Sequence, residues 1–247
     1  MTDRESLATR RKRSRDDAGK ADVPLRQAAY ERIEDLLNNG VLRPGQIITQ
    51  RELVEMTGTT LGSVREAVPR FEAEGLLQTL PQRGLMVPSL DIIFVRDAYQ
   101  MRRVIELAAV PDMVVRLSRD LIAEWIDWHR SARSRIQERA GASSEDLSHE
   151  IQHRDWDMHE SFVSTMRNKL IANVYRVTAI KIRMVVQSRI QVTRYNATRI
   201  INEHLGILEP LHKGDVGGTQ AALARHLDNS LKIALGGTVD DSETRTQ

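Results

Sequence analysis

The sequence predicts a mainly α-helical protein, in which a winged helix-turn-helix of three helices and a β-hairpin precedes an all-α helical bundle. Three observations favour this fold class. Apolar residues recur at helical spacing along most of the chain, and glycine and proline residues separate these stretches. Aromatic residues make up only 4% of the sequence. Aliphatic side chains must therefore fill the core, which suits helices.

The composition sets limits on the class of protein. The chain has 247 residues, enough for two modest domains, and its 40% hydrophobic content is typical of globular proteins. The net charge of +2 does not by itself indicate a nucleic-acid partner. The basic excess is local, in a run from Arg10 to Arg15 within a tail predicted over residues 1–20. That tail is either a solvated segment or an arm that contacts DNA phosphates.

Several kinds of protein are excluded or disfavoured. The chain has no cysteine, so it can form neither a disulfide nor a thiolate metal site. It contains no apolar run of the roughly 18 residues that span a bilayer. The N-terminus lacks the apolar segment of a signal peptide. We therefore expect a cytoplasmic protein that is associated with the nucleoid when bound to DNA.

The winged helix-turn-helix is expected over residues 21–89. Its apolar periodicity and its glycine stops predict helices over residues 24–39, 50–57 and 61–73, and hairpin strands over 76–80 and 85–88. Thr60 is the expected N-cap of the third helix. Pro69 is expected to kink that helix, because it removes a hydrogen bond to the carbonyl of Arg65.

Residues with DNA-binding chemistry gather in this unit. A helix-turn-helix presents the first residues of its second helix to base edges. Arg65 lies one turn into that helix and can reach a guanine edge or a phosphate, while Arg51 is placed to meet the backbone. Arg83 and Gly84 form the hairpin tip, which either enters the minor groove or is an exposed turn. The small residues expected at the backbone are Thr59, Thr60, Gly62 and Ser63.

The second domain is predicted over residues 90–236, followed by a loose tail over 237–247. Helices are expected near residues 91–109, 112–117, 120–140, 145–167, 169–193, 197–213 and 217–235. Pro111 is expected to separate the first two of these helices.

Four residues of this domain form a candidate metal site. Asp155 and His159 are four residues apart and project from one side of a helix. His204 and His226 lie on apolar faces of the last two helices, which a short glycine-rich loop should hold antiparallel. One carboxylate and three imidazoles suit Zn²⁺, and also Ni²⁺ or Mn²⁺. The alternative is that each histidine is an ordinary hydrogen-bonded core residue.

Two further observations bear on this domain. His149 and His153 form a rival pair, which helical geometry places on the polar surface. Arg102 shares a helix face with Val95 and Ile105, and a buried arginine can clamp a carboxylate with two hydrogen bonds. The alternative for Arg102 is an internal salt bridge, for instance to Glu106.

The N-terminal motifs carry a family resemblance. They are Leu42-Arg-Pro-Gly-Gln, Gln50-Arg-Glu-Leu-Val, Gly58-Thr-Thr-Leu-Gly-Ser-Val-Arg-Glu-Ala-Val, Phe71-Glu-Ala-Glu-Gly-Leu-Leu and Arg83-Gly-Leu-Met-Val. Their order and spacing resemble the DNA-binding domain of GntR-family repressors. The resemblance implies a homodimer on a palindromic operator. The chain departs from the family pattern at Leu61, Gly62 and Ser63.

The C-terminal part resembles the all-helical FCD-type ligand-binding domain of the FadR branch of that family. The motifs are Asp155-x-x-x-His159, Glu203-His204 with Asp215 downstream, and Ala224-Arg-His226-Leu. The short form of that branch often binds a divalent metal through these four positions, and the helix around Arg102 resembles the first helix of the domain.

Three functions follow as hypotheses. The first is a repressor whose operator binding responds to a small organic acid or sugar acid, bound at the metal and near Arg102. The second is a sensor in which the metal itself is the signal. The third is a metal-dependent hydrolase. It is disfavoured, because the chain has no nucleophile motif and helical geometry turns Glu160 about 100° away from His159.

Overall fold

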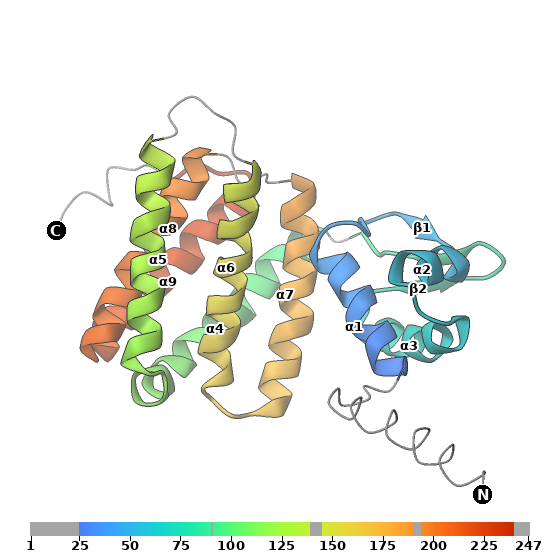
Figure 1. The fold of residues 1–247 in the computed structure, drawn as a ribbon, viewed down its shortest axis with the longest axis horizontal. Helices are drawn as coiled ribbons and strands as arrows, with labels where there is room; N and C mark the ends of the chain where they lie inside the picture. The colour runs from blue at the N-terminus through green and yellow to red at the C-terminus, as the bar shows by residue number, and fades with distance from the viewer. Residues whose placement is uncertain (1–24, 90, 139–144, 190–193, 240–247) are drawn as a thin grey trace, which may run out of the picture.

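The computed structural model describes residues 25–89, 91–138, 145–189 and 194–239. It confirms the fold class, with a small three-helix and three-strand unit beside a bundle of long helices (Figure 1). The basic tail predicted over residues 1–20 lies outside the described residues, as does the C-terminal segment 240–247. No helix of the described residues is long and apolar enough to cross a membrane.

The N-terminal unit begins with three helices, namely α1 (Leu25–Asn38), α2 (Gln50–Thr57) and α3 (Leu61–Ala73). The boundaries of α2 and α3 follow from local chemistry. Thr49 caps α2 in a reciprocal pair with Glu52, and Gly58 ends it with a φ of 61°. Thr60 caps α3 by accepting a hydrogen bond from the Ser63 backbone, as predicted. Pro69 occupies an exposed position, and α3 continues past it to Ala73.

The wing is part of a three-stranded antiparallel sheet in the order β1-β3-β2. The strands are β1 (Ile47–Ile48), β2 (Gln78–Leu80) and β3 (Gly84–Met86). β2 and β3 are the predicted hairpin, whereas β1 is too short to show an alternating pattern. A Cβ on Gly84 would lie 2.6 Å from the carbonyl oxygen of Ile48, so only glycine fits where β1 meets the hairpin.

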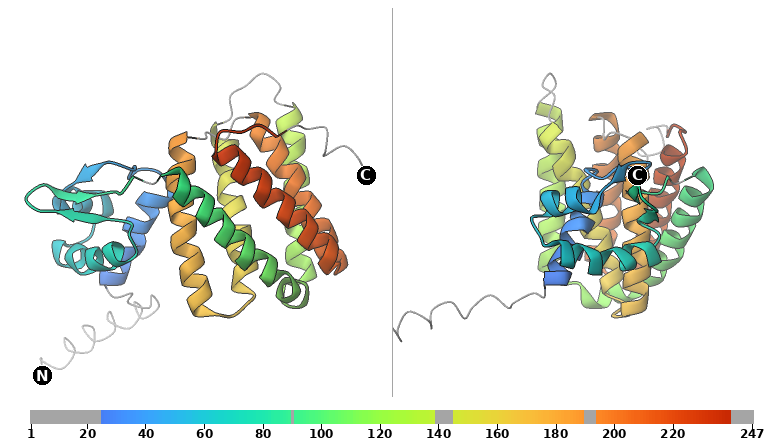
Figure 2. Two further views of the ribbon diagram at one scale, coloured as in Figure 1. Left: turned by 180° about the vertical axis from the view of Figure 1, so that it is seen from behind. Right: turned by 90° about the vertical axis from the view of Figure 1, so that its right-hand side faces the viewer.

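The bundle consists of α4 (Ile92–Arg116), α5 (Arg119–Glu138), α6 (Glu145–Ser164), α7 (Lys169–Arg189), α8 (Arg194–Lys213) and α9 (Val216–Ala234). The predicted break at Pro111 is wrong, because α4 runs through it. Proline cannot bond to the carbonyl of Leu107, but the side-chain amide of Gln220 on α9 donates to that oxygen at 3.2 Å. Figure 2 shows α4 and α9 side by side.

Helix α7 belongs to two cores. Ile180 and Met184 pack into the core of the N-terminal unit, with residues such as Ile33 and Phe71. Other α7 residues, including Ile182, pack into the core beneath α4 and α6. In Figure 1, α7 accordingly stands between the bundle and α1. The predicted division at residues 89 and 90 remains a prediction, and packing crosses it.

Polar contacts join the same surfaces. Arg176 on α7 donates to Glu34 on α1 at 2.5 Å and to Glu74 at 2.9 Å. Glu74 is the C-cap of α3 and also accepts from the Tyr30 hydroxyl at 2.6 Å. Burial and the bond to Glu74 raise the pKa of Tyr30, so its hydroxyl remains protonated and donates. The C-terminal end of α3 is therefore tied to α7.

Candidate metal centre and nucleic-acid interface

The structure brings together the four residues predicted to bind a metal. Asp155 and His159 come from α6, His204 from α8 and His226 from α9, and each offers a ligand atom within 4.8 Å of the others. His204 Nε2 lies 2.9 Å from Asp155 Oδ1. His159 Nε2 lies 3.3 Å from His226 Nε2. All three imidazoles are buried.

Local structure explains this convergence. The spacing of four residues places Asp155 and His159 on consecutive turns of one helix face. Helices α8 and α9 pack together across a turn at Gly214, where Asp215 caps α9 by accepting from the Gly218 backbone.

Two of the histidines are oriented by buried glutamates. His159 Nδ1 lies 2.5 Å from Glu106 Oε2, and His226 Nδ1 lies 2.8 Å from Glu203 Oε2. Burial alone would raise the pKa of each glutamate, but nearby Arg and His groups lower both pKa values to about 2. The carboxylates are thus ionised and accept the Nδ1 protons. The Nε2 lone pairs of both histidines face the cluster.

His204 is oriented by a fourth histidine, His129 on α5. Nδ1 of His129 lies 2.7 Å from the carbonyl oxygen of Trp125, so it must donate. Burial lowers the pKa of His129 to about 3, which leaves its Nε2 as an acceptor for His204 Nδ1 at 3.0 Å. Nε2 of His204 then carries a lone pair. It makes no hydrogen bond with a described residue, although Asp155 lies beside it.

The donor set fits a divalent cation. Three imidazole lone pairs and one carboxylate point at one another, and every Nδ1 proton is directed outward. Without positive charge between them these lone pairs repel, and a cation relieves that repulsion. Three nitrogens and one oxygen suit Zn²⁺, Ni²⁺ or Mn²⁺. Of the rival pair, His153 is exposed, and the side chain of His149 lies outside the described residues.

The sequence interpretation missed His129 and the roles of Glu106 and Glu203. A signal for His129 was present, since it follows Trp125 by four residues on the apolar stripe of α5. Glu203 stands in a quoted motif, and Glu106 was named as a possible salt-bridge partner of Arg102. Their histidine partners lie on other helices, and spacing along one helix cannot reveal them.

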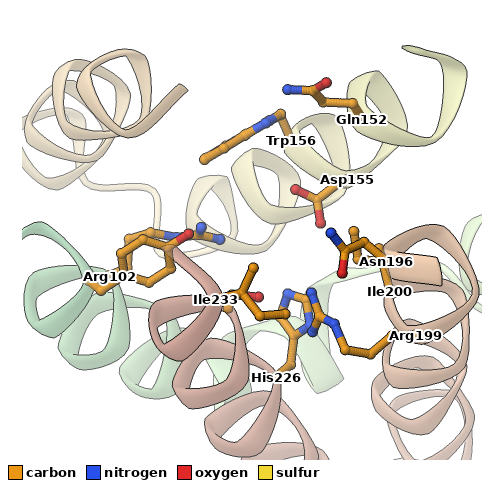
Figure 3. A pocket seen from close by; sticks show the side chains of 11 residues that line it. Arg102, Gln152, Asp155, Trp156, Asn196, Arg199, Ile200, His226 and Ile233 are labelled. Atoms are coloured by element: carbon orange, nitrogen blue, oxygen red, sulfur yellow. The ribbon is translucent and has the colours of Figure 1, made fainter. Parts of the chain in front are cut away.

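A cavity of about 70 Å³ adjoins the cluster. Its lining combines apolar, polar and charged side chains, namely Tyr99, Arg102, Gln152, Asp155, Trp156, Asn196, Arg199, Ile200, His226, Ser230 and Ile233. Figure 3 shows Asp155 and His226 between Arg102 on one side and Arg199 on the other.

Arg102 shows features of both interpretations. Its Nε donates to Glu106 Oε1 at 2.7 Å, which is the internal salt bridge considered as the alternative. Its Nη2 is buried and has no hydrogen-bond partner among the described residues. That atom lies on a residue that lines the cavity, so Arg102 retains a donor for a ligand. Its role in effector binding remains a prediction.

The predicted DNA-binding residues divide into two groups. Arg51, Arg65 and Arg83 are exposed, and Arg65 has only a 3.3 Å contact with Gln50. The hydroxyl groups instead hold the turn together. Thr60 pairs with Ser63 at 2.8 Å, Thr59 pairs with Thr57 at 2.8 Å, and Ser63 is buried. Gly62 is exposed at the start of α3, and Gly84 begins β3. DNA contacts by all of these residues remain predictions.

Comparison with protein families gives two matches. Residues 25–87 match the model described as bacterial regulatory proteins, gntR family. Residues 97–229, more than half of the chain, match the model of the FCD domain.

Individual relatives agree with these matches. The uncharacterized HTH-type transcriptional regulator BphR of Paraburkholderia xenovorans is 25% identical over 216 residues, which are 85% of this chain and 84% of that protein. The similar regulator YdhC of Bacillus subtilis is 30% identical over 81 residues, and the match spans only 36% of its length. The structure of McbR/YncC of E. coli superposes with a TM-score of 0.73 at 18% identity, covering 87% of this chain and 98% of that one.

Proposed function

Because the chain belongs to the GntR family of bacterial regulatory proteins and carries an FCD domain, we propose that this DNA-binding transcriptional regulator is a repressor controlled by a small carboxylate at a divalent-metal site. Members of the family and the relatives above are regulators, not enzymes, which removes the hydrolase hypothesis. We propose that the regulator acts in the cytoplasm, at the nucleoid, because its proposed target is DNA.

The proposal of a metal rests on one observation. Each of the three histidines directs its Nδ1 proton to an outer partner and its Nε2 lone pair to the cluster beside Asp155. Outer partners of this kind are usual for metal-binding histidines, because they fix the tautomer and the ring orientation. A bound divalent ion supplies positive charge for a ligand carboxylate. This chain's residues orient the histidines and keep the site away from solvent.

The proposal of a carboxylate effector rests on the cavity and on Arg102. The Nη2 of Arg102 is a charged donor that has no acceptor among the described residues, and Arg102 lines a cavity that also reaches Asp155 and His226. A carboxylate satisfies such a donor with a charge-assisted hydrogen bond. We propose small organic acids or sugar acids as the effector class.

Helix α7 offers a route from this site to the DNA-binding unit. The Tyr175 hydroxyl donates to Glu106 Oε1 at 2.8 Å, and Glu106 also contacts Arg102 and His159. The next residue, Arg176, donates to Glu74 at the end of α3. A ligand that moves Glu106 therefore acts on the helix that supports α3. In a dimer, this changes the spacing of the two recognition helices, to which half-site binding is sensitive.

We propose a homodimer on a palindromic operator. Exposed apolar side chains on one face of α4 support this proposal, because a second copy of the chain would cover them. Val104 is 71% exposed and Val115 is 79% exposed, and helical spacing places Ala108 and Pro111 between them. Exposed apolar stripes of this kind mark interaction surfaces.

The test combines DNA binding with metal analysis. Metal content of the purified protein should be close to one divalent ion per chain. Fluorescence anisotropy on its own promoter region should show salt-sensitive binding that requires a palindrome and weakens when an effector acid is added. Binding with no sequence preference at any salt concentration would reject the regulator mechanism. A metal-free protein with full acid response would reject the metal site.

A metal sensor is the second candidate, and one observation favours it. His159 contacts Glu106 directly, and Glu106 contacts Tyr175 on α7, so metal occupancy alone acts on the same route. Operator affinity titrated with metal, and then with acids at saturating metal, separates the two. If metal alone accounts for the whole response, the effector mechanism is wrong.

A further inference from the structure

The cluster is flanked by two arginine–glutamate pairs of the same design. On α4, Arg102 pairs with Glu106 four residues later. On α8, Arg199 pairs with Glu203 four residues later. Each glutamate then accepts the Nδ1 proton of one candidate ligand, Glu106 from His159 and Glu203 from His226. The arrangement occurs twice, on opposite sides of the site.

Each arginine also retains one unused donor. The side chains of Arg102 and Arg199 are 3% and 6% exposed. The Nη2 of Arg102 and the Nε of Arg199 are buried, and neither has a hydrogen-bond partner among the described residues. Buried polar groups are normally paired, so two charged donors left open beside one cavity indicate a missing acceptor on each side.

One cavity adjoins both arginines. Both arginines line it, and Figure 3 shows them entering from α4 and α8 with Asp155 and His226 between them. Its volume of about 70 Å³ is several times the roughly 10–15 Å³ that one water requires. Trp156, Ile200 and Ile233 supply apolar walls. The space fits a short molecule with a polar group at each end.

Charge decides what those polar groups are. Among the described residues, the charged groups that line the cavity or pair with its arginines are Arg102, Arg199, Asp155, Glu106 and Glu203, which leave one negative charge in excess. Arg183, which stacks on Trp156, is neutralised by Glu160. A divalent ion changes the excess to one positive charge. A ligand with a single negative charge balances it, whereas a dianion leaves a buried negative charge.

We propose that Arg199 is a second residue that binds the effector, in addition to Arg102. This inference rests on the proposed function. The effector is a monocarboxylate whose far end carries a neutral acceptor oxygen, a hydroxyl or carbonyl group. The carboxylate pairs with Nη2 of Arg102, and the far oxygen accepts the Nε–H of Arg199. Arg199 thereby selects for the far oxygen, and the charge count selects against a second carboxylate.

A matched series of acids tests this on the full-length, zinc-loaded protein. The probes are ω-hydroxy acids of three to six carbons, the alkanoates of the same length without the hydroxyl group, and the dicarboxylates of the same length. Calorimetric titration and thermal shift should show at least one ω-hydroxy acid binding about 10- to 100-fold more tightly than both of its partners, the gain of a hydrogen bond to a charged group.

The variant Arg199→Lys keeps a positive charge for Glu203 and removes the Nε–H. The ratio of hydroxy-acid to alkanoate affinity should fall to about one. This ratio does not respond to a general loss of stability. Arg130→Lys, in an exposed pair with Glu209, is the matched control and should retain the wild-type ratio.

The outcomes are distinct. Equal affinity for hydroxy acids and alkanoates, or an unchanged ratio in Arg199→Lys, overturns this inference while leaving the effector site intact. Dicarboxylates that bind as tightly as the hydroxy acids overturn the charge argument and with it the proposed class. Absence of binding by every acid overturns both this inference and the carboxylate part of the proposed function.

Discussion

The proposed DNA-binding face and the proposed metal centre hold their polar side chains in opposite ways. At the metal centre, every imidazole has an outer partner on another helix, and the polar atoms are buried. On the proposed DNA-binding face, Arg51, Arg65 and Arg83 extend into solvent. The turn between α2 and α3 is ordered by the Thr60 cap and by Arg32 of α1, which donates to the backbone carbonyls of Thr57 and Gly58. In our proposal, the first site is organised before its ligand arrives, whereas the exposed arginines of the second are ordered only when they contact DNA. Substitutions should therefore affect stability and binding together at the first site, and binding alone at the second.

The largest effect is expected from removing a ligand of the metal. His204→Ala should lose the bound ion, and with it the stabilisation by acids. At a free metal concentration about 1,000 times the Kd, the lost metal contribution to unfolding free energy is about 4 kcal/mol. Metal analysis and thermal unfolding with and without a chelator measure both effects. His153→Ala, an exposed histidine on α6, is the control. Full metal content in His204→Ala would contradict the assignment.

A smaller effect is expected from His129, which does not contact the metal position directly in our assignment. His129→Phe removes the acceptor that orients His204. Metal affinity should fall about 10- to 100-fold, the usual effect of losing an outer partner. Competition with a chelating dye measures it. An unchanged Kd would show that the site does not depend on this partner, and that the contrast with the DNA-binding face is weaker than we infer.

On the DNA-binding face, Arg65→Ala should weaken specific operator binding by about 1–3 kcal/mol. Because Arg65 is exposed, the free energy of unfolding of the Arg65→Ala protein should differ from that of the wild type by less than about 0.5 kcal/mol. Anisotropy at several salt concentrations and denaturant titration give the two numbers. Arg116→Ala, on an exposed residue of α4, is the matched control. A large loss of stability in Arg65→Ala would remove the distinction between the two regions.

An effect on stability alone is expected at the α4–α9 contact. Gln220→Leu removes the donor that satisfies the Leu107 carbonyl beside Pro111. The free energy of unfolding should fall by about 1–3 kcal/mol if that carbonyl becomes unpaired, and by less if water reaches it. DNA affinity should not change. Denaturant titration measures the loss, and Gln220→Glu, which cannot donate from its carboxylate, should behave in the same way.

Sequence patterns were sufficient where the determinants are local. Thr60 and Gly58 fix the ends of α3 and α2, and the spacing of Asp155 and His159 correctly places them on one face. The patterns failed where a distant residue decides the outcome. Pro111 looked like a break, because Gln220 lies more than 100 positions away along the chain. His129 was missed although it lies on the apolar stripe of α5, because its role depends on His204 on another helix.

The dual packing of α7 has a consequence for how this chain can be divided. Ile180 and Met184 form part of the hydrophobic interior of the N-terminal unit, although they lie about ninety positions beyond its last strand. A fragment cut at residue 89 would expose the apolar surface that these two side chains cover. A chimaera that transplants the DNA-binding unit onto another sensor must therefore bring a surface equivalent to α7 with it. The segment that recombination can exchange between such regulators is therefore larger than the winged helix-turn-helix, because it must include a surface equivalent to α7.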